Sequence, residues 1–228
     1  MEVVVNSKRP IRSYVIRSGR LTTSQRKALE DYWKLHGVEF QSKLFEFDAI
    51  FEQSNNLIIE IGFGMGDSLL EMAATNPQQN YLGIEVHKPG IGKLLHGIAS
   101  HGLRNLKIVC HDAREVLSDC LQDESIQQVQ IFFPDPWPKK RHHKRRLIQP
   151  KFIQLLVGKL NSSGTIHLAT DWQAYAEHMM EVLQSNNQLQ NCEGEGCYWA
   201  NPERPDTKFE NRGRKLGHGV WDLLFTKR

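Results

Sequence analysis

Five acidic residues share one kind of position along the chain, at the end of a short apolar run or within two residues of that end. They are Glu60, Glu85, Asp112, Asp135 and Asp171. Ligands of an open α/β sheet bind beyond the carboxyl ends of its strands, so these carboxylates are predicted to face one crevice. There they would accept hydrogen bonds from hydroxyl and amino groups of a ligand. Each acid taken alone could instead cap the next helix, and that alternative suits Asp171 best.

A glycine-rich turn follows the first apolar run, with the sequence EIGFGMG at 60–66. Its glycines, Gly62, Gly64 and Gly66, allow a tight turn and let the backbone approach a ligand closely. A dinucleotide-binding fingerprint would need a further glycine at position 67, which is Asp67. The turn therefore predicts a cofactor without a pyrophosphate.

Two of the acids suit recognition of an adenosine. Glu85 lies about 20 residues beyond the glycine turn, where an acid can accept hydrogen bonds from both ribose hydroxyls. Asp112 stands after the third apolar run, where it can accept a hydrogen bond from the adenine amino group. Together with the glycine turn, these positions predict a bound adenosine.

A proline-rich turn follows the fourth apolar run, in the sequence FFPDPWPK at 132–139. Three prolines in five residues restrict the backbone and would hold Asp135 and Trp137 at the mouth of the crevice. Trp137 is compatible with two roles, stacking on a nucleic-acid base or packing within the turn.

The positive charge of the chain is concentrated in the run KKRHHKRR at 139–146. The formal net charge is +3, but without the six Lys and Arg of this run, 23 cationic side chains would face 26 acids. A charge run is often only a solvated face. This run adjoins the predicted crevice and contains arginines, which bind phosphate through two parallel hydrogen bonds, so it predicts binding of RNA or DNA.

The spacing of the apolar residues predicts a doubly wound α/β fold with a mostly parallel sheet and helices on both faces. The predicted strands are 57–61, 81–85, 106–110, 129–133, 165–170 and 220–225, and the predicted helices are 24–36, 147–160 and 172–183, the first opened by Ser24. Residues 1–20 carry five basic side chains and show no period, which predicts a flexible basic arm before a single domain over 21–228.

The composition disfavours several classes of protein. With 39% hydrophobic and 24% charged residues among 228, the chain is typical of soluble globular proteins, and its start lacks the features of a signal peptide. We expect no metal site, because the histidines lack ligand spacing and the cysteines form no CxxC pair. This cysteine usage favours the cytoplasm. The cysteines are Cys110, Cys120, Cys192 and Cys197.

Five stretches of this sequence closely resemble the bacterial tRNA (guanine-N7-)-methyltransferases. They are EIGFGMG (60–66), GIEVHKPGIG (83–92), FPDPWPKKRHHKRRL (133–147), ATDW (169–172) and RPDTKFENRG (204–213). The first is shared in outline by many S-adenosylmethionine enzymes, whereas the third and the last are diagnostic of this family. The resemblance spans most of the chain, without a departure inside the motifs.

The resemblance implies a class I methyltransferase fold, which transfers a methyl group from S-adenosyl-L-methionine to N7 of guanine 46 in the tRNA variable loop and releases S-adenosyl-L-homocysteine. Asp135 matches the proposed catalytic residue. The implied cofactor contacts are Glu60, Glu85, Asp112 and Asp135, beside Gly62, Gly64 and Gly66 of the turn. The implied substrate contacts are Lys139, Asp171, Thr207, Lys208, Phe209 and Glu210. The implied RNA-binding segment is Arg141, His142, His143, Lys144, Arg145 and Arg146.

Other functions remain as alternatives at this point. A methyltransferase acting on rRNA, DNA or a protein would share the cofactor motifs but not the RPDTKFENRG stretch. An RNA-binding protein without turnover would not need all five acids, and an oxidoreductase using NAD is disfavoured by Asp67. We expect tRNA as partner, no membrane, and a monomer or homodimer that needs no second protein.

Overall fold

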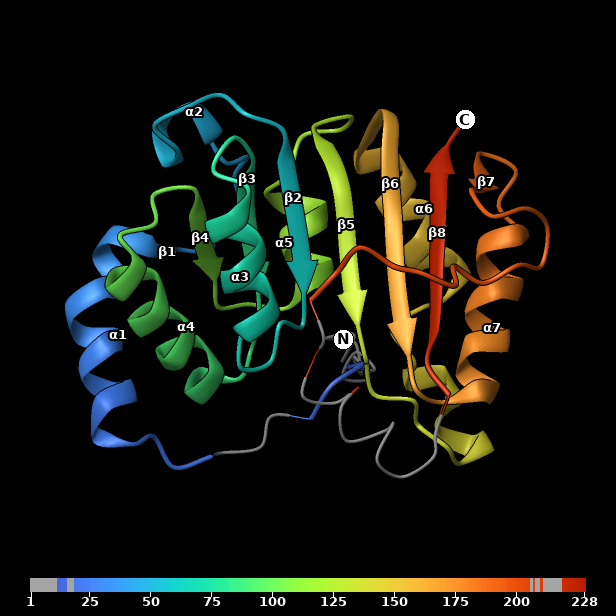
Figure 1. Cartoon of the computed structure of the whole chain (residues 1–228), viewed down its shortest axis with the longest axis horizontal. Helices are drawn as coiled ribbons and strands as arrows, with labels where there is room; N and C mark the ends of the chain where they lie inside the picture. The colour runs from blue at the N-terminus through green and yellow to red at the C-terminus, as the bar shows by residue number, and fades with distance from the viewer. Residues whose placement is uncertain (1–11, 16–18, 206, 208–209, 211–218) are drawn as a thin grey trace, which may run out of the picture.

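An eight-stranded sheet forms the centre of the structure, with the strand order β1-β4-β3-β2-β5-β6-β8-β7 (Figure 1). The computed structural model describes residues 12–15, 19–205, 207, 210 and 219–228. All neighbouring strands run parallel except β8, which pairs antiparallel with β6 and β7. The strands are β1 (Gly37–Val38), β2 (Leu57–Ile61), β3 (Asn80–Ile84), β4 (Leu106–Val109), β5 (Ile126–Phe132), β6 (Leu160–Thr170), β7 (Leu189–Asn191) and β8 (Trp221–Lys227).

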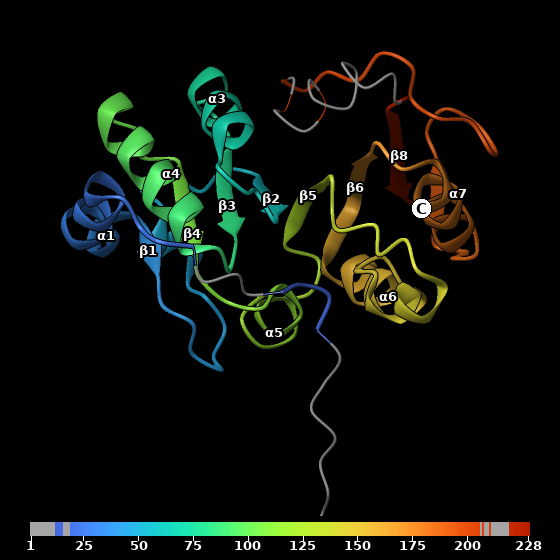
Figure 2. The same ribbon diagram turned by 90° about the horizontal axis from the view of Figure 1, so that it is seen from below.

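Helices cover both faces of this sheet, which confirms the predicted doubly wound α/β class (Figure 2). One face carries α1 (Thr23–His36), α3 (Asp67–Thr75) and α4 (Lys88–His101). The other carries α5 (Ala113–Asp119), α6 (Pro150–Lys159) and α7 (Gln173–Gln184). Two short helices, α2 (Phe47–Ile50) and the 3-10 helix η1 (Lys140–Arg145), lie in connections. Within the described ranges no helix combines the length and apolar character needed to span a bilayer.

The predicted elements are present, with shifted ends. The first helix begins one residue earlier than predicted, and its cap is Thr22 rather than Ser24, because Thr22 and Gln25 cap each other's backbone N–H groups. The second predicted helix, at 147–160, starts only at Pro150, which lacks an N–H and suits a first helical position. Strands β1 and β7 were not predicted, since two or three residues show no period.

The strand order reverses between β2 and β5, and this reversal places a crevice at their carboxyl ends. Beyond β5, the face of the sheet that carries α3 is polar, because Gln130, His167 and Asp222 are buried there on β5, β6 and β8. No described helix covers this part. The C-terminal segment crosses it instead, and residues 192–205 pass in front of β8, β6 and β5 (Figure 1).

Helix α4 packs directly against the glycine turn that follows β2. Gly66 caps α3 with a φ of 76°, a conformation that glycine adopts without strain, and a Cβ there would lie 2.9 Å from Leu94. Gly90, at the start of α4, approaches the turn even more closely. A Cβ on Gly90 would lie 1.8 Å from the carbonyl oxygen of Gly64. The conformation of the turn therefore depends on glycine at position 90.

The variant Gly90→Ala is expected to lower the free energy of unfolding by about 1 to 3 kcal/mol, because the turn and the helix must move apart. Denaturant titration measures this change. Gly158→Ala is the matched control, since Gly158 lies in a helix with nothing within 4 Å of its added Cβ. We expect this control to be neutral or more stable by up to ~1 kcal/mol. An equal free energy of unfolding for the two variants would contradict the close approach of Gly90 to Gly64.

Candidate active site

A cavity of about 370 Å³ opens at the carboxyl ends of β2 to β5, at the point where the strand order reverses. Four of the five acids that the sequence singled out line this cavity, namely Glu60, Glu85, Asp112 and Asp135. Asp171 does not line it. The alternative interpretation of Asp171 as a helix cap is also wrong, because Trp172 is the N-cap of α7. The rule of strand ends thus placed four of the five acids at one cavity.

Glu85 is fixed by three backbone N–H groups. Its Oε2 accepts a hydrogen bond of 2.9 Å from the N–H of Gly64, in the glycine turn. Its Oε1 accepts bonds of 2.6 and 3.0 Å from the N–H groups of Val86 and His87. A carboxylate has about four acceptor positions, so Glu85 can accept further hydrogen bonds from the cavity. Gly62 and Gly64 leave open space beside it, since an added Cβ on either would meet nothing within 4 Å.

Glu60 is a carboxyl group buried at the inner end of the cavity. It is 3% exposed, and its Oε2 has no hydrogen-bond partner in the described part of the chain. Burial, followed by the negative charge of Glu85, raises the pKa of Glu60 from 4.5 to about 8. Its register neighbour Gln130 also has a buried oxygen without a described partner. This inner end is therefore suited to a ligand that brings a hydrogen-bond donor or a positive charge.

The pKa of Glu60 makes the stability of the ligand-free protein depend on pH. The folded state binds the proton more tightly than the unfolded state, so stability falls as the pH rises from about 4.5 toward about 8. When the pH rises from 6 to 8.5, the free energy of unfolding should fall in the unchanged chain. In Glu60→Gln we expect this fall to be smaller by on the order of 2 kcal/mol. Denaturant titrations at the two pH values test this. The exposed control Glu71→Gln should retain the full pH dependence, and equal slopes for all three proteins would contradict the assignment.

Asp112 caps α5 and contacts the N-terminal arm as well as the cavity. Its Oδ1 accepts a 2.9 Å hydrogen bond from the N–H of Arg114, so the cap and the site share one carboxylate. Tyr14 reaches Asp112 from the arm, and burial, the charge of Asp112 and a hydrogen bond to it raise the pKa of Tyr14 to about 12. Ser13 and Tyr14 line the cavity. The sequence missed both, because the arm has no periodic pattern.

Asp135 lies at the cavity mouth between two residues with left-handed backbone conformations. The φ of Phe133 is 51° and that of Trp137 is 46°, conformations that each carry about 1 to 3 kcal/mol of strain. Asp135 itself is exposed. Trp137 packs against segments outside the turn: its indole N–H donates to the carbonyl oxygen of Ser13 at 3.1 Å, and Arg145 of η1 lies over its ring. Of the two roles left open for Trp137, the structure favours packing.

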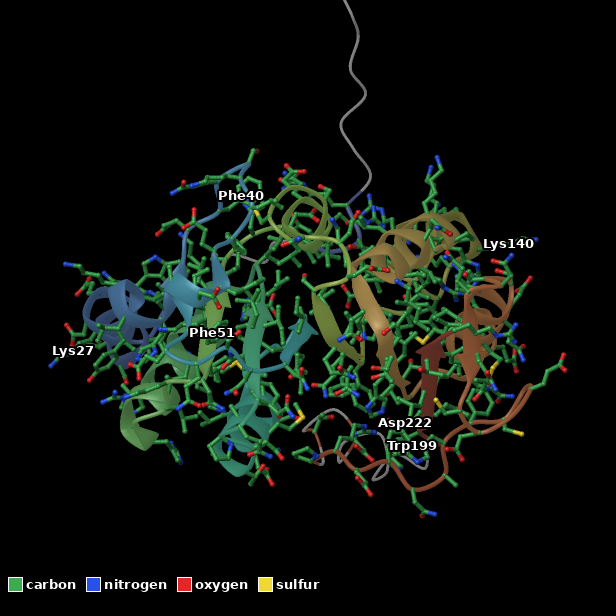
Figure 3. The ribbon with its side chains drawn as sticks, turned by 90° about the horizontal axis from the view of Figure 1, so that it is seen from above. Lys27, Phe40, Phe51, Lys140, Trp199 and Asp222 are labelled. Atoms are coloured by element: carbon green, nitrogen blue, oxygen red, sulfur yellow. The ribbon has the colours of Figure 1, made fainter. Side chains whose placement is uncertain are left out.

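The basic run forms η1, directly after the turn that carries Asp135. Lys139 precedes this helix as its N-cap and is exposed, as are Lys140, Arg141 and Lys144. His142, His143 and Arg145 are partly exposed. The run therefore presents most of its charge to solvent, and Lys140 projects outward from the body of the protein (Figure 3).

Arg146 differs from the rest of the run. It is 2% exposed, donates a 3.0 Å hydrogen bond from Nε to the carbonyl oxygen of Pro136, and lies over the ring of Tyr175. The expectation that Arg146 contacts RNA does not fit this structure, since its guanidinium instead fixes the proline-rich turn. Sequence alone could not separate it from its neighbours, because burial follows from packing.

The C-terminal motif contributes one residue to the cavity and one to the buried structure beside it. Thr207 lines the cavity, and its Oγ1 accepts a hydrogen bond from the N–H of Glu210. Glu210 is 2% exposed and forms an ion pair with Arg204. The other two predicted residues of this motif, Lys208 and Phe209, lie outside the described residues.

The described residues contain no group of three His, Cys, Asp or Glu side chains placed to hold a metal ion. The four cysteines are free thiols.

The sequence and the fold were compared with known proteins. A family profile described as "Putative methyltransferase" matches residues 54–223. The "tRNA (guanine-N(7)-)-methyltransferase" of Actinobacillus succinogenes is 53% identical over 224 residues, which cover 96% of this chain and 89% of that protein. The protein of the same name from Pasteurella multocida is 51% identical over 222 residues, covering 97% and 87%. The crystal structure of the 16S rRNA methyltransferase KamB has a TM-score of 0.59 at 13% identity, covering 81% of this chain and 94% of that one.

The fold and the family profile are those of the doubly wound α/β methyltransferases. Sequence identity above 50% over nearly the whole chain then gives the particular family. The chain belongs to the tRNA (guanine-N(7)-)-methyltransferases.

Proposed function

We propose that this chain transfers the methyl group of S-adenosyl-L-methionine to N7 of guanine 46 in the variable loop of tRNA, forming 7-methylguanosine. The observation that carries the proposal is the cavity shared by Glu60, Glu85, Asp112 and Asp135, with the basic run directly after the turn of Asp135. The family supports the same reaction. The chain works without a second protein, as a monomer or homodimer, and its free cysteines favour a cytoplasmic location.

The residues of the cavity fit S-adenosyl-L-methionine. The unpartnered buried oxygen of Glu60 suits the ammonium group of the amino-acid part, and the open space at Gly62 and Gly64 admits the ligand beside the backbone. Glu85 would accept hydrogen bonds from the ribose hydroxyls, and Asp112 from the adenine amino group. When bound, the cofactor supplies an electrophilic methyl group on a positively charged sulfur.

Positioning is the main task of the protein in this reaction. Guanine N7 carries a lone pair and no proton, so no residue has to remove a proton before the new bond forms. Holding the two reactants in a productive arrangement can supply roughly 7 to 11 kcal/mol of the barrier. The strained backbone around Asp135 and the buried guanidinium of Arg146 keep the mouth of the cavity in one arrangement.

The carboxylate of Asp135 has two further roles in the proposed reaction. The methylated base is a cation, and the exposed carboxylate of Asp135 stabilises that developing charge. Guanine also presents N1–H and N2–H donors that adenine lacks at the matching positions, and Asp135, which lines the cavity, would accept them. A carboxylate left without these donors makes binding of adenine unfavourable.

The experiment combines the purified chain with labelled S-adenosyl-L-methionine and unmodified tRNA transcripts that carry guanine or adenine at position 46. Nucleoside mass spectrometry identifies the product. We expect 7-methylguanosine from the guanine transcript alone. Methylation of the adenine transcript would move the target to another position, and cofactor binding without any methylation would favour another substrate or a binding protein.

A further inference from the structure

Four charged or titratable side chains form a buried cluster beneath the C-terminal segment. The guanidinium of Arg204 pairs with both oxygens of Asp222, with Nε–Oδ1 and Nη2–Oδ2 distances of 2.7 and 2.8 Å. Its Nη1 donates to Glu210, and Nε2 of His167 lies 2.7 Å from Oδ1 of Asp222. All four side chains are only 2 to 3% exposed. Asp222 and Trp199 lie side by side where the segment crosses β8 (Figure 3).

Arg204 also contacts the turn that carries Asp135. Its guanidinium carbon lies 5.4 Å from the ring centre of Phe132 and 5.5 Å from that of Phe133. Phe133 has the left-handed φ of 51°, stands two residues before Asp135 and lines the cavity. A cation over an aromatic face is attracted by it. Arg204 thus contacts a residue of the proline-rich turn whose backbone is left-handed.

The pKa of Asp222 depends on Arg204. Burial alone would raise the pKa of Asp222, but hydrogen bonds from Arg204 and His167 and the positive charge of Arg204 bring it below its ordinary value. Only an arginine has the planar set of donors that can serve Asp222 and Glu210 together. Removing it would take from Asp222 and Glu210 the guanidinium group that both buried acids contact.

We propose that Arg204 is a positioning residue for the base-binding side of the cavity. Anchored by Asp222 on β8, it holds the turn of Asp135 through Phe133 and the end of the 207–210 segment through Glu210. The part of the inference that concerns the base rests on the proposed function. Arg204 itself does not line the cavity, so it acts through these two neighbours.

A buried ion cluster that served stability alone would behave differently. Its loss would lower the fraction of folded protein but leave each folded molecule with its normal kinetics. If Arg204 positions the base-binding side, its loss should lower kcat/KM for tRNA in each folded molecule. The adenosine side, formed by Glu85 and Asp112, is not in contact with Arg204 and should keep its affinity.

The test uses Arg204→Met, Arg204→Lys and Asp222→Asn in the full chain, with Lys159→Met as control. Lys159 is also a buried cation, bonded to Asp123 and to the carbonyl oxygen of Leu121 at 2.7 Å, but it lies at the other end of the strands. Titration with S-adenosyl-L-methionine counts folded sites and gives the Kd. Methylation kinetics are then expressed per site, and hydrogen exchange of peptides covering 199–210 reports on the segment without any need for activity.

For Arg204→Met we expect kcat/KM for tRNA to fall about 50-fold or more per site, with the cofactor Kd within threefold. Exchange of the 199–210 peptides should rise at least tenfold. Arg204→Lys should recover part of the loss, Asp222→Asn should show about a tenfold defect, and Lys159→Met should match the unchanged chain per site. If Arg204→Met fails to fold, the results for Arg204→Lys and Asp222→Asn test the proposal.

Normal kinetics per site and unchanged exchange in the Arg204 and Asp222 variants would overturn the inference, as would an equal defect in Lys159→Met. If the unchanged chain forms no 7-methylguanosine, the proposed function fails, and the exchange measurement alone then decides whether Arg204 positions the segment.

Discussion

Replacing Asp135 with asparagine is expected to lower kcat for methyl transfer by about two to three orders of magnitude, while the Kd of S-adenosyl-L-methionine stays within roughly threefold. The substitution keeps the size of the side chain and removes its negative charge. Asp135 is exposed and lines the cavity, between two residues with left-handed backbone conformations, and the proposed function places the base beside it. The charge should therefore matter most when the purine becomes cationic.

Single-turnover kinetics with saturating tRNA measure this change, because they separate the chemical step from product release. Asp48→Asn is the matched control, since Asp48 is an exposed acid in α2, outside the cavity. It should behave as the unchanged chain. An Asp135→Asn protein with normal single-turnover rates would remove Asp135 from the catalytic account.

Replacing Lys140, Arg141 and Lys144 together with glutamine is expected to weaken tRNA binding by one to two orders of magnitude near ~0.1 M salt. These three side chains of η1 are exposed, in the segment that directly follows the turn of Asp135, and are free of ion pairs in the part of the chain that the structure describes. Each lost phosphate contact lowers the slope of log K against log salt by about 0.7 to 0.9. The slope of the triple variant should therefore be smaller by about 2 to 3.

The control removes the same charge elsewhere, by replacing Arg26, Lys27 and Lys34 of α1 with glutamine. These residues are exposed, and Lys27 lies on the opposite side of the molecule from Lys140 (Figure 3). The control separates contact with RNA from the effect of net charge. If both triple variants change the slope equally, the basic run does not form the phosphate contacts.

The sequence predicted the sheet and four acids of the site for a simple physical reason. Buried parallel strands are nearly continuous apolar runs, and their carboxyl ends meet at one edge, so Glu85 and Asp135 could be placed together without a structure. Strand β2 was predicted with its observed bounds. The same rule also predicted that Asp171 faces the crevice, but Asp171 does not line the cavity. The rule identifies the edge of the sheet and not how far the cavity extends along it.

The remaining parts of the site depend on contacts between distant segments. Arg204 meets Phe132 and Asp222 only after the C-terminal segment has crossed the sheet. Tyr14 reaches Asp112 from an arm that has no pattern of its own. The burial of Arg146 is likewise invisible in a run of similar cations. Packing between segments far apart in the sequence determines these three features, and the spacing of residues along the chain does not predict such packing.

The most direct test of the central claim uses a tRNA in which position 46 alone is 7-deazaguanosine, where carbon replaces N7. The hydrogen-bonding N1–H, N2–H and O6 groups are unchanged, so binding should equal that of the guanine tRNA within about twofold. We expect methylation of the guanine tRNA and no methyl group on the modified one. Methylation of the 7-deazaguanosine tRNA at the normal rate would contradict N7 of guanine 46 as the target.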